Sequence, residues 1–279
     1  MNLTLELGDR REIMVLDLDP SLPNEATILA ALQAGHLYEP DVSLAMIRIL
    51  RPGDVFVDVG VNAGFFSVLG ARLVGATGRV LGLEPDPRSL ARLPGRLAAN
   101  NLGNVTILPV AASDRAGDIT FHLNMDDSGG SALWDPGRFP GNTASQQNPS
   151  NVVVPAVRLD ATLAAQGSGP PRLIKIDTEG ADHAVLLGAT DVLTGRRVPF
   201  VITELHEFGL RQMGSSQADL RRMMAALGYE AFLLSHDGSL PKWLPAGTAL
   251  RSEYIRNLLF TTGELLSTIW PEEVPNLIV

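Results

Sequence analysis

The sequence predicts an α/β fold built on a doubly wound, mostly parallel sheet. Between residues 55 and 204, short apolar runs rich in Val, Ile, Leu and Phe alternate with segments of helical periodicity. That alternation is typical of strands joined by crossover helices, which place parallel strands side by side. Hydrophobic residues make up 45% of the 279 residues, so the chain can bury one large core.

The first 50 residues are expected to form a helical approach segment ahead of this domain, which is predicted to span 51–279. Residues 26–32 and 42–50 both carry apolar side chains at helical spacing. The sequence Arg51-Pro52-Gly53-Asp54 is typical of a turn and separates the two parts.

The strands and helices of the domain are predicted in a regular order. The expected strands of the main sheet are 55–59, 79–83, 105–110, 173–176 and 200–203. The expected helices are 65–74, 87–97, 181–193 and 218–227. Pro94-Gly95 is expected to kink or break the second of these. Further strands are expected at 118–123 and 152–159, and 229–234 is expected to pair with 255–260 as an antiparallel closing pair.

Residues 124–151 are predicted to be a long loop on the substrate side of the domain. The segment is rich in Gly, Asn, Ser, Pro and Gln and shows no periodicity. Loops of this length in a compact domain tend to be functional, and we expect this one to act as a mobile cover. The Asp126-Asp127 pair within it is interpreted as a solvated turn rather than a metal site.

Composition excludes several classes of function. The formal net charge of −9 argues against nucleic-acid binding, which needs a basic face. The absence of cysteine excludes a disulfide scaffold, a thiol nucleophile and a thiolate zinc site. The N-terminus lacks the apolar core of a signal peptide, and no apolar run is long enough to span a membrane. We therefore expect a cytoplasmic protein with no membrane partner; the sequence does not indicate an oligomeric state.

Candidate ligand-binding residues follow the predicted strands. In doubly wound sheets, ligands bind beyond the carboxyl ends of the strands. The Gly-rich loop from Asp58 to Gly64 follows the first strand, and Glu84 follows the second, where a carboxylate can accept both hydroxyls of a ribose. The nicotinamide-dinucleotide fingerprint is not met, because Asn62 and Phe65 occupy its later glycine positions. An adenosine with a short amino-acid tail still fits.

Three motifs together resemble those of the FkbM-type methyltransferases. They are Asp58-Val59-Gly60-Val61-Asn62-Ala63-Gly64-Phe65-Phe66-Ser67, Glu84-Pro85-Asp86-Pro87, and Leu173-Ile174-Lys175-Ile176-Asp177-Thr178-Glu179-Gly180-Ala181-Asp182. The resemblance extends from about Tyr38 to Phe260, with Val61 and Asp182 as departures from the usual pattern. It implies a Rossmann-like class I methyltransferase fold, S-adenosylmethionine as methyl donor, and a hydroxyl acceptor on a sugar or a specialised metabolite such as a polyketide.

The resemblance also implies roles for individual residues. Asp58, Gly60, Asn62 and Gly64 would hold the methionine part of the donor, with Phe65 and Ser67 in the same motif, and Glu84 would bind the ribose. Asp86, with Pro85 before it, would flank the adenine together with Ala111 and Ala112, and Tyr38 and Glu39 would close over the methionine end.

The acceptor side is expected at the ends of the fourth and fifth strands. Asp177, Glu179, Glu204 and His206 are the candidate catalytic residues there, since several ionisable groups cluster in two adjacent loops. His206 is the favoured base for removing the acceptor proton. Alternatively, Asp177 and Glu204 hold Mg²⁺, which would acidify the hydroxyl. We favour the side chain, because the sequence marks no third oxygen ligand, and assign no metal site.

Two other functions remain open at this point. A carboxyl methyltransferase of the same fold would need no base. A non-catalytic partner protein could have kept the fold, although the intact Asp58–Gly64 loop, Glu84 and Asp177 speak against it.

Overall fold

The computed structural model describes residues 2–7, 10–167, 169–248, 250, 255–270 and 277–278. Its centre is an eight-stranded sheet with the order β12-β11-β13-β10-β9-β3-β4-β5. The five strands from β10 to β5 are parallel. They are β3 (Val55–Val59), β4 (Arg79–Leu83), β5 (Val105–Leu108), β9 (Leu173–Ile176) and β10 (Phe200–Leu205). The doubly wound, mostly parallel sheet is confirmed.

The predicted closing pair is also confirmed. β11 (Glu230–Leu233) and β13 (Arg256–Thr261) run antiparallel, and β13 in turn lies antiparallel to β10. The short strand β12 (Lys242–Trp243) extends the sheet beyond β11.

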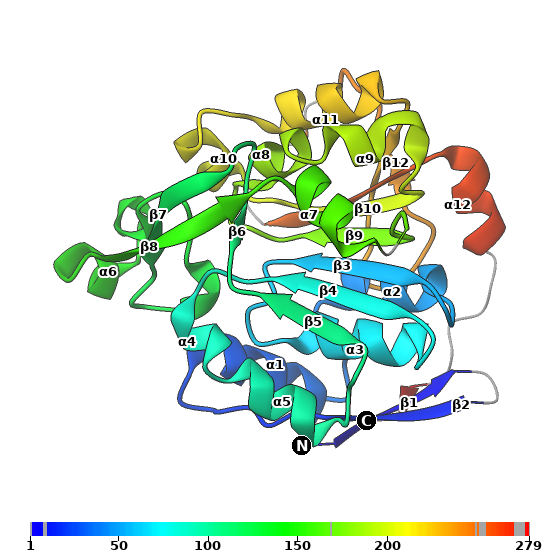
Figure 1. Ribbon diagram of the computed structural model, residues 1–279, viewed down its shortest axis with the longest axis horizontal. Coiled ribbons are helices and arrows are strands. Elements are labelled where there is room, and N and C mark those ends of the chain that lie inside the picture. The colour runs from blue at the N-terminus through cyan, green and yellow to red at the C-terminus, as the bar shows by residue number, and fades with distance from the viewer. Residues whose placement is uncertain are drawn as a thin grey trace.

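Helices cover both faces of the sheet (Figure 1). Because side chains alternate along a strand, Phe56 and Ile202 face one helical layer while Val57 and Ile174 face the other. The first layer comprises α1 (Pro23–Gln33), α2 (Pro40–Ile49), α3 (Phe65–Val74) and α12 (Gly263–Ile269). The second comprises α7 (Leu159–Gln166), α8 (Asp182–Leu187), α9 (Thr190–Leu193) and α11 (Gln217–Ala226). Between α9 and β10 lies the short 3₁₀ turn η3 (Thr194–Arg196).

The N-terminal segment is helical only from Pro23 onward. Its first part is a β-hairpin of β1 (Asn2–Leu7) and β2 (Arg10–Val15), which pairs with β14 (Leu277–Ile278) near the C-terminus. The expectation of a helical segment over the first 50 residues was therefore wrong for residues 2–7 and 10–22, the first part of which pairs locally as a hairpin.

Two predicted helices are divided. The break in the second lies between α4 (Pro87–Leu90) and α5 (Leu93–Ala99), not at Pro94, because Pro94 stands in the first turn of α5, where no backbone donor is lost. The predicted helix 181–193 becomes α8 and α9, separated at Gly188, whose backbone packs against the carbonyl of Ser113.

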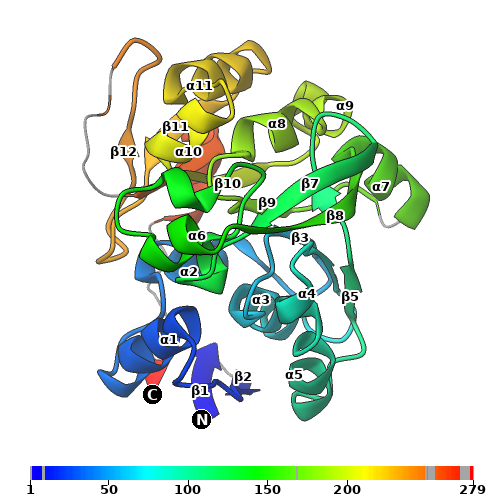
Figure 2. The ribbon, with the colours of Figure 1, turned by 90° about the vertical axis from the view of Figure 1, so that its left-hand side faces the viewer.

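The two further strands predicted at 118–123 and 152–159 do not belong to the main sheet. β7 (Gly117–Leu123) and β8 (Ser150–Val157) pair antiparallel and, with β6 (Ala111–Ala112), form a separate three-stranded sheet. Figure 2 shows this sheet and α6 (Thr143–Gln147) in front of the carboxyl edge of the main sheet. The connection between β7 and β8 holds α6 and two 3₁₀ turns, η1 (Ser128–Gly130) and η2 (Pro136–Arg138).

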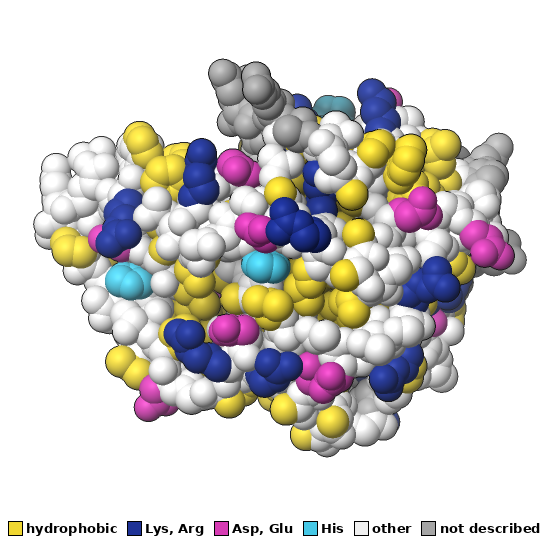
Figure 3. Space-filling model, turned by 90° about the horizontal axis from the view of Figure 1, so that it is seen from above, with side chains coloured by type: hydrophobic (Ala, Val, Ile, Leu, Met, Phe, Trp, Pro, Cys, Tyr) yellow, Lys and Arg dark blue, Asp and Glu magenta, His cyan; other side chains and the backbone are white. Residues whose placement is uncertain are grey.

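Charges of both signs are interspersed on the face that carries α11 (Figure 3), and the described side chains there form no continuous basic patch. None of the helices in the described ranges combines the length and apolar character that crossing a bilayer requires.

Candidate active site

A cavity of about 570 Å³ opens at the carboxyl edge of the sheet. Most residues predicted from the sequence line it. On the donor side these are Tyr38, Glu39, Gly60, Asn62, Glu84, Pro85, Asp86, Ala111, Ala112 and Asp177. The four candidate catalytic residues, Asp177, Glu179, Glu204 and His206, also line it. The segment 121–142 forms the opposite wall, so the predicted long loop does face this cavity.

Four predicted cofactor residues do not line the cavity. Asp58 is fully buried and accepts a hydrogen bond from Ser67 Oγ at 2.6 Å, so its side chain faces α3. Gly64 is the N-cap of α3, where a β-carbon would overlap Leu93, and Phe65 packs edge-on against Tyr38. Asp58 and Ser67 thus bond to each other behind the loop and do not line the cavity.

Gly60 joins the two central strand ends. Its φ of 87° is a left-handed conformation, and a β-carbon here would collide with the Asp177 carbonyl. Three non-glycine residues on the cavity wall also adopt positive φ: Glu39 at 39°, Asn62 at 48° and Glu179 at 55°. Strained backbone of this kind concentrates at ligand sites.

Glu84 is placed by the backbone around it. Its Oε2 accepts from the Asn62 amide at 2.6 Å and its Oε1 from the Asp86 amide at 2.7 Å. Burial raises the pKa of this carboxyl to about 7, although both hydrogen bonds oppose the rise. The carboxylate is thus held rigidly at the cavity wall, where its remaining lone pairs can receive ribose hydroxyls.

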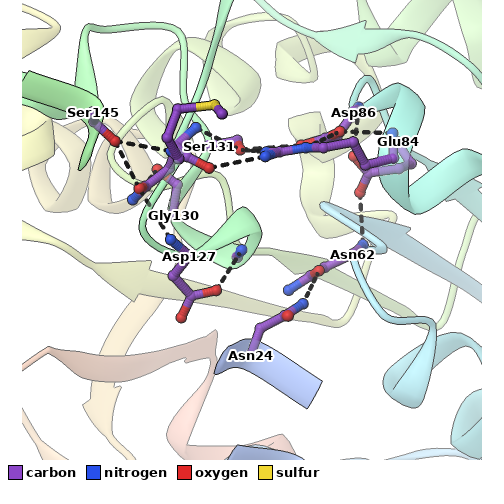
Figure 4. Close-up of polar contacts among 12 residues, drawn as sticks. Asn24, Asn62, Glu84, Asp86, Asp127, Gly130, Ser131 and Ser145 are labelled. Atoms are coloured by element: carbon purple, nitrogen blue, oxygen red, sulfur yellow. Dashed lines mark hydrogen bonds and ion pairs between the residues drawn. The ribbon is translucent and has the colours of Figure 1, made fainter. Parts of the chain in front are cut away.

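A polar network ties the donor side to the long connection (Figure 4). Asp86 accepts from Ser131 Oγ at 3.0 Å, and Arg88 bridges both residues and also donates to the Asn124 carbonyl at 2.9 Å. On the other side of the loop, Asn24 of α1 donates to the Asn62 side chain at 2.8 Å. The predicted loop is therefore fastened at its base by charged hydrogen bonds.

The acidic pair in this connection has structural partners. Asp126 accepts from the backbone amides of Ala144 and Ser145 at the start of α6, at 2.8 and 2.9 Å. Asp127 accepts from the Gly129 amide at 2.9 Å. Asp127 caps a local turn, which agrees with the interpretation of a turn, whereas Asp126 binds the first amides of α6 far along the chain.

The acceptor side is built around a histidine and a glutamate. His206 Nδ1 lies 2.9 Å from Glu179 Oε2, and the histidine is 8% exposed. Burial alone would lower the pKa of His206, but the hydrogen bond and charge of Glu179 outweigh it and raise that pKa. Trp134 donates its indole N–H to the Glu179 carbonyl at 2.6 Å and, with Phe139, packs its ring against His206.

Glu204 belongs to a group of carboxylates whose negative charges are not fully balanced by nearby cations or hydrogen bonds. Its Oε2 is buried without a hydrogen-bond partner among the described residues. Burial, then the charges of Asp177, Glu179 and Asp182, raise the pKa of Glu204 well above its ordinary value. A cationic ligand would relieve this repulsion.

Sequence reasoning missed several residues of the site. Lys175 is a charge inside an apolar strand, an anomaly that could have singled it out. Trp134 is the one tryptophan in the long connection. Asp182, fully buried, accepts from the Glu204 amide at 3.1 Å and from Thr178 Oγ1 at 2.8 Å, and no pattern in the sequence marks it as more than a helix start.

Stability should fall as the pH rises from the ordinary carboxyl range through about 7. Burial raises the pKa of Glu39, Glu84 and Asp182 to about 7 and that of Asp58 to about 6. The folded chain therefore binds more protons than the unfolded chain between the ordinary carboxyl range and about pH 7, and the free energy of unfolding decreases across that interval. Thermal denaturation of the ligand-free protein should give a higher Tm at pH 6 than at pH 8. Glu84→Gln should reduce this difference and exposed Glu264→Gln should not; a Tm that increases with pH would contradict the assignment.

Comparison with known proteins agrees with this geometry. Residues 58–231, more than half of the chain, match the family model described as the methyltransferase FkbM domain. A curated relative, the 31-O-demethyl-FK506 methyltransferase FkbM of Streptomyces tacrolimicus, is 30% identical over 212 residues, which cover 67% of this chain and 80% of that protein.

Two solved structures are more distantly similar. The methyltransferase FkbM from Methylobacillus flagellatus KT has a TM-score of 0.45 and 14% identity; the match covers 78% of this chain and 50% of that one. A SAM-dependent methyltransferase from Aquifex aeolicus has a TM-score of 0.42 and 13% identity, with 88% and 98% covered.

The doubly wound sheet, its edge cavity and the family match define an S-adenosylmethionine-dependent methyltransferase. Within that class, the chain belongs to the FkbM methyltransferase family.

Proposed function

We propose that this protein transfers a methyl group to a hydroxyl of an uncharged small molecule, such as a sugar or a specialised metabolite of the polyketide kind. The observation that carries this proposal is the charge of the cavity wall. The acidic lining residues are Glu39, Asp41, Glu84, Asp86, Asp127, Asp177, Glu179 and Glu204. None of the described lining residues is a Lys or Arg; Arg88 and Lys175, which pair with Asp86 and Asp177, lie outside the lining. A carboxylate acceptor would be repelled, so a hydroxyl fits better than the carboxyl alternative.

The cavity suits S-adenosylmethionine as donor. Its volume lies within the range of small-molecule sites, and its acidic donor side matches a positively charged ligand. Glu84 would hold the ribose, Asp86 and the Ala111–Ala112 pair would border the adenine, and Gly60 and Asp177 would border the methionine part. When bound, S-adenosylmethionine supplies a methyl group on a positively charged sulfur that is already activated for displacement.

His206 is proposed as the acceptor of the hydroxyl proton. Because Nδ1 lies 2.9 Å from Glu179 Oε2, we assign Nε2 as the ring nitrogen that receives the proton. Glu179 fixes the ring and stabilises its charge once the proton has arrived. The acceptor oxygen then forms its bond to the methyl carbon while the carbon–sulfur bond breaks. The positive charge lost from the sulfur is matched by the proton that His206 has received, so the total charge of the site does not change.

A divalent cation is the second candidate for activating the hydroxyl. Ligand atoms of Glu179, Glu204 and His206 lie within 4.8 Å of one another, a group that includes Glu204 but not Asp177, the other ligand considered from the sequence. Asp177, the partner considered for Mg²⁺, is instead paired with Lys175 at 2.8 Å. We favour proton transfer to His206, since its Nδ1 already has Glu179 as partner.

The function is tested by offering labelled donor together with matched pairs of acceptors. Each pair carries the same ring with either a hydroxymethyl or a carboxylate group, across sugars, glycosides and alicyclic polyketides. Label should enter the hydroxyl member of a pair, because the acidic wall excludes the carboxylate member. Transfer to carboxylates in preference to hydroxyls would overturn the proposal. Donor binding without transfer to any member would favour the non-catalytic alternative.

A further inference from the structure

A lysine lies buried behind the donor side of the cavity, and the chemistry above gives it no part. Lys175 belongs to β9 and is 2% exposed, in a strand that is otherwise apolar. Its Nζ lies 2.8 Å from Asp177 Oδ2 and 4.4 Å from the centroid of the Phe66 ring. An ammonium this deeply buried is costly unless opposite charges surround it.

Three carboxylates surround this ammonium. Asp177 pairs with it directly, and Asp58 is its register partner across β3 and β9. Glu39, the N-cap of α2, also interacts with it electrostatically. Because β3, the end of β9 and the start of α2 each contribute one carboxylate, Lys175 is the common counter-charge of three separate segments.

Two of these carboxylates lie on the cavity wall. Asp177 and Glu39 both line the cavity, and the charge of Asp177 is, after burial, the next cause that raises the pKa of Glu39, so Glu39 needs a nearby cation to ionise. Glu39 also holds a positive φ of 39°, so its segment adopts a strained conformation against β9. Without the ammonium of Lys175, the charge of Asp177 would act on Glu39 without this compensation.

We propose that Lys175 is a positioning residue for donor binding, which holds Asp177 and Glu39 together as carboxylates so that they attract the positively charged S-adenosylmethionine. It does not touch the cavity; it acts through the two acids that do. The proposal depends on donor binding alone, so it stands or fails separately from the identity of the acceptor.

The pH dependence of donor binding follows from Glu39. Burial, then Asp177, raise the pKa of Glu39 to about 7, and Lys175 works against that rise. The charged and titratable groups around Glu39 are Tyr38 and Asp41 on its own segment, Asp177 and Lys175 on β9 and the loop after it, and Glu204 on β10. Affinity for the cationic donor should increase as Glu39 ionises, and loss of Lys175 should move that increase to higher pH.

The test is calorimetric titration of the full chain with S-adenosylmethionine between pH 6 and 9. The unmodified protein should gain affinity with a midpoint near pH 7. In Lys175→Met the midpoint should move up by about one pH unit or more, and the affinity at pH 7 should fall roughly 10-fold or more. Lys242→Met, which removes the exposed lysine on β12, should leave both quantities unchanged.

A second variant separates positioning from folding. Glu39→Gln should flatten the pH dependence, and Lys175→Met/Glu39→Gln should lose less affinity than the two single losses combined, because both act on one cluster. If the midpoint of the affinity increase is unshifted in Lys175→Met, Lys175 has only a structural role. The same conclusion follows if the affinity losses of the two single variants add strictly in the double variant. If Lys175→Met does not fold, a pH profile in Glu39→Gln identical to that of the unmodified protein overturns the proposal by itself.

Discussion

Replacing His206 by alanine should lower turnover by roughly 10²–10⁴-fold while donor affinity stays unchanged. His206 lies on the acceptor side of the cavity with Glu179 at its Nδ1, so its removal takes away the proton acceptor without touching the donor side. Because a base must be neutral to act, the rate of the unmodified enzyme should rise with pH through the raised pKa of His206. Steady-state kinetics from about pH 5.5 to 9, with donor binding measured in parallel, would check both expectations.

His183→Ala is the matched control. His183 is hydrogen-bonded to Ser215 at 2.7 Å and does not line the cavity, so its loss should leave turnover little changed. A chelator should also have little effect. Loss of activity on chelation, restored by added Mg²⁺, together with a mild His206→Ala phenotype, would instead favour a cation held by Glu179, Glu204 and His206.

Substituting Gly60 by alanine should impair both folding stability and donor binding. A side chain costs roughly 1–2 kcal/mol in the left-handed region, and overpacking adds typically about 1–3 kcal/mol. Here the new methyl would collide with the Asp177 carbonyl, which must move if the chain is to remain folded. We therefore expect a lower Tm and at least a roughly 10-fold loss of affinity for S-adenosylmethionine, measured by thermal denaturation and calorimetry.

Replacing Gly95 by alanine should have the opposite effect on stability. Gly95 lies in α5, where an added β-carbon would meet no atom within 4 Å, so alanine there should stabilise the helix by about 0.5–1 kcal/mol. Donor affinity should be unaffected. Equal effects at Gly60 and Gly95 would mean that the close approach of Gly60 to Asp177 has no energetic consequence.

The central fold was predictable because its signals are local. Runs such as 55–59 and 173–176 are mostly apolar, since both faces of a parallel strand are covered. The hairpin of β1 and β2 is a local pairing that was missed, whereas its contact with Leu277–Ile278 was not predictable in this way, because it joins segments far apart in the sequence. The small β6-β8-β7 sheet was missed as a unit for the same reason, although β7 and β8 were expected as strands.

The candidate site was predictable where it depends on strand ends. Glu84, Asp177 and Glu204 meet at one edge because parallel strands bring their carboxyl ends together. The direction of each side chain was harder to predict: Asp58 belongs to the same motif but faces α3, since neighbouring residues of a strand point to opposite faces. Trp134 reaches the site only through the folding of its long connection, which periodicity does not describe.

The hydrogen bond from Trp134 bears on how the connection between β7 and β8 could be replaced by a different one. The indole is fastened to the main-chain carbonyl of residue 179 and not to a side chain. A main-chain acceptor is present whichever amino acid stands there, so this joint does not constrain the chemistry of residue 179. A chimaeric enzyme could therefore receive a different cover between the two strands of the β7–β8 hairpin, provided that the graft brings one indole to the same point.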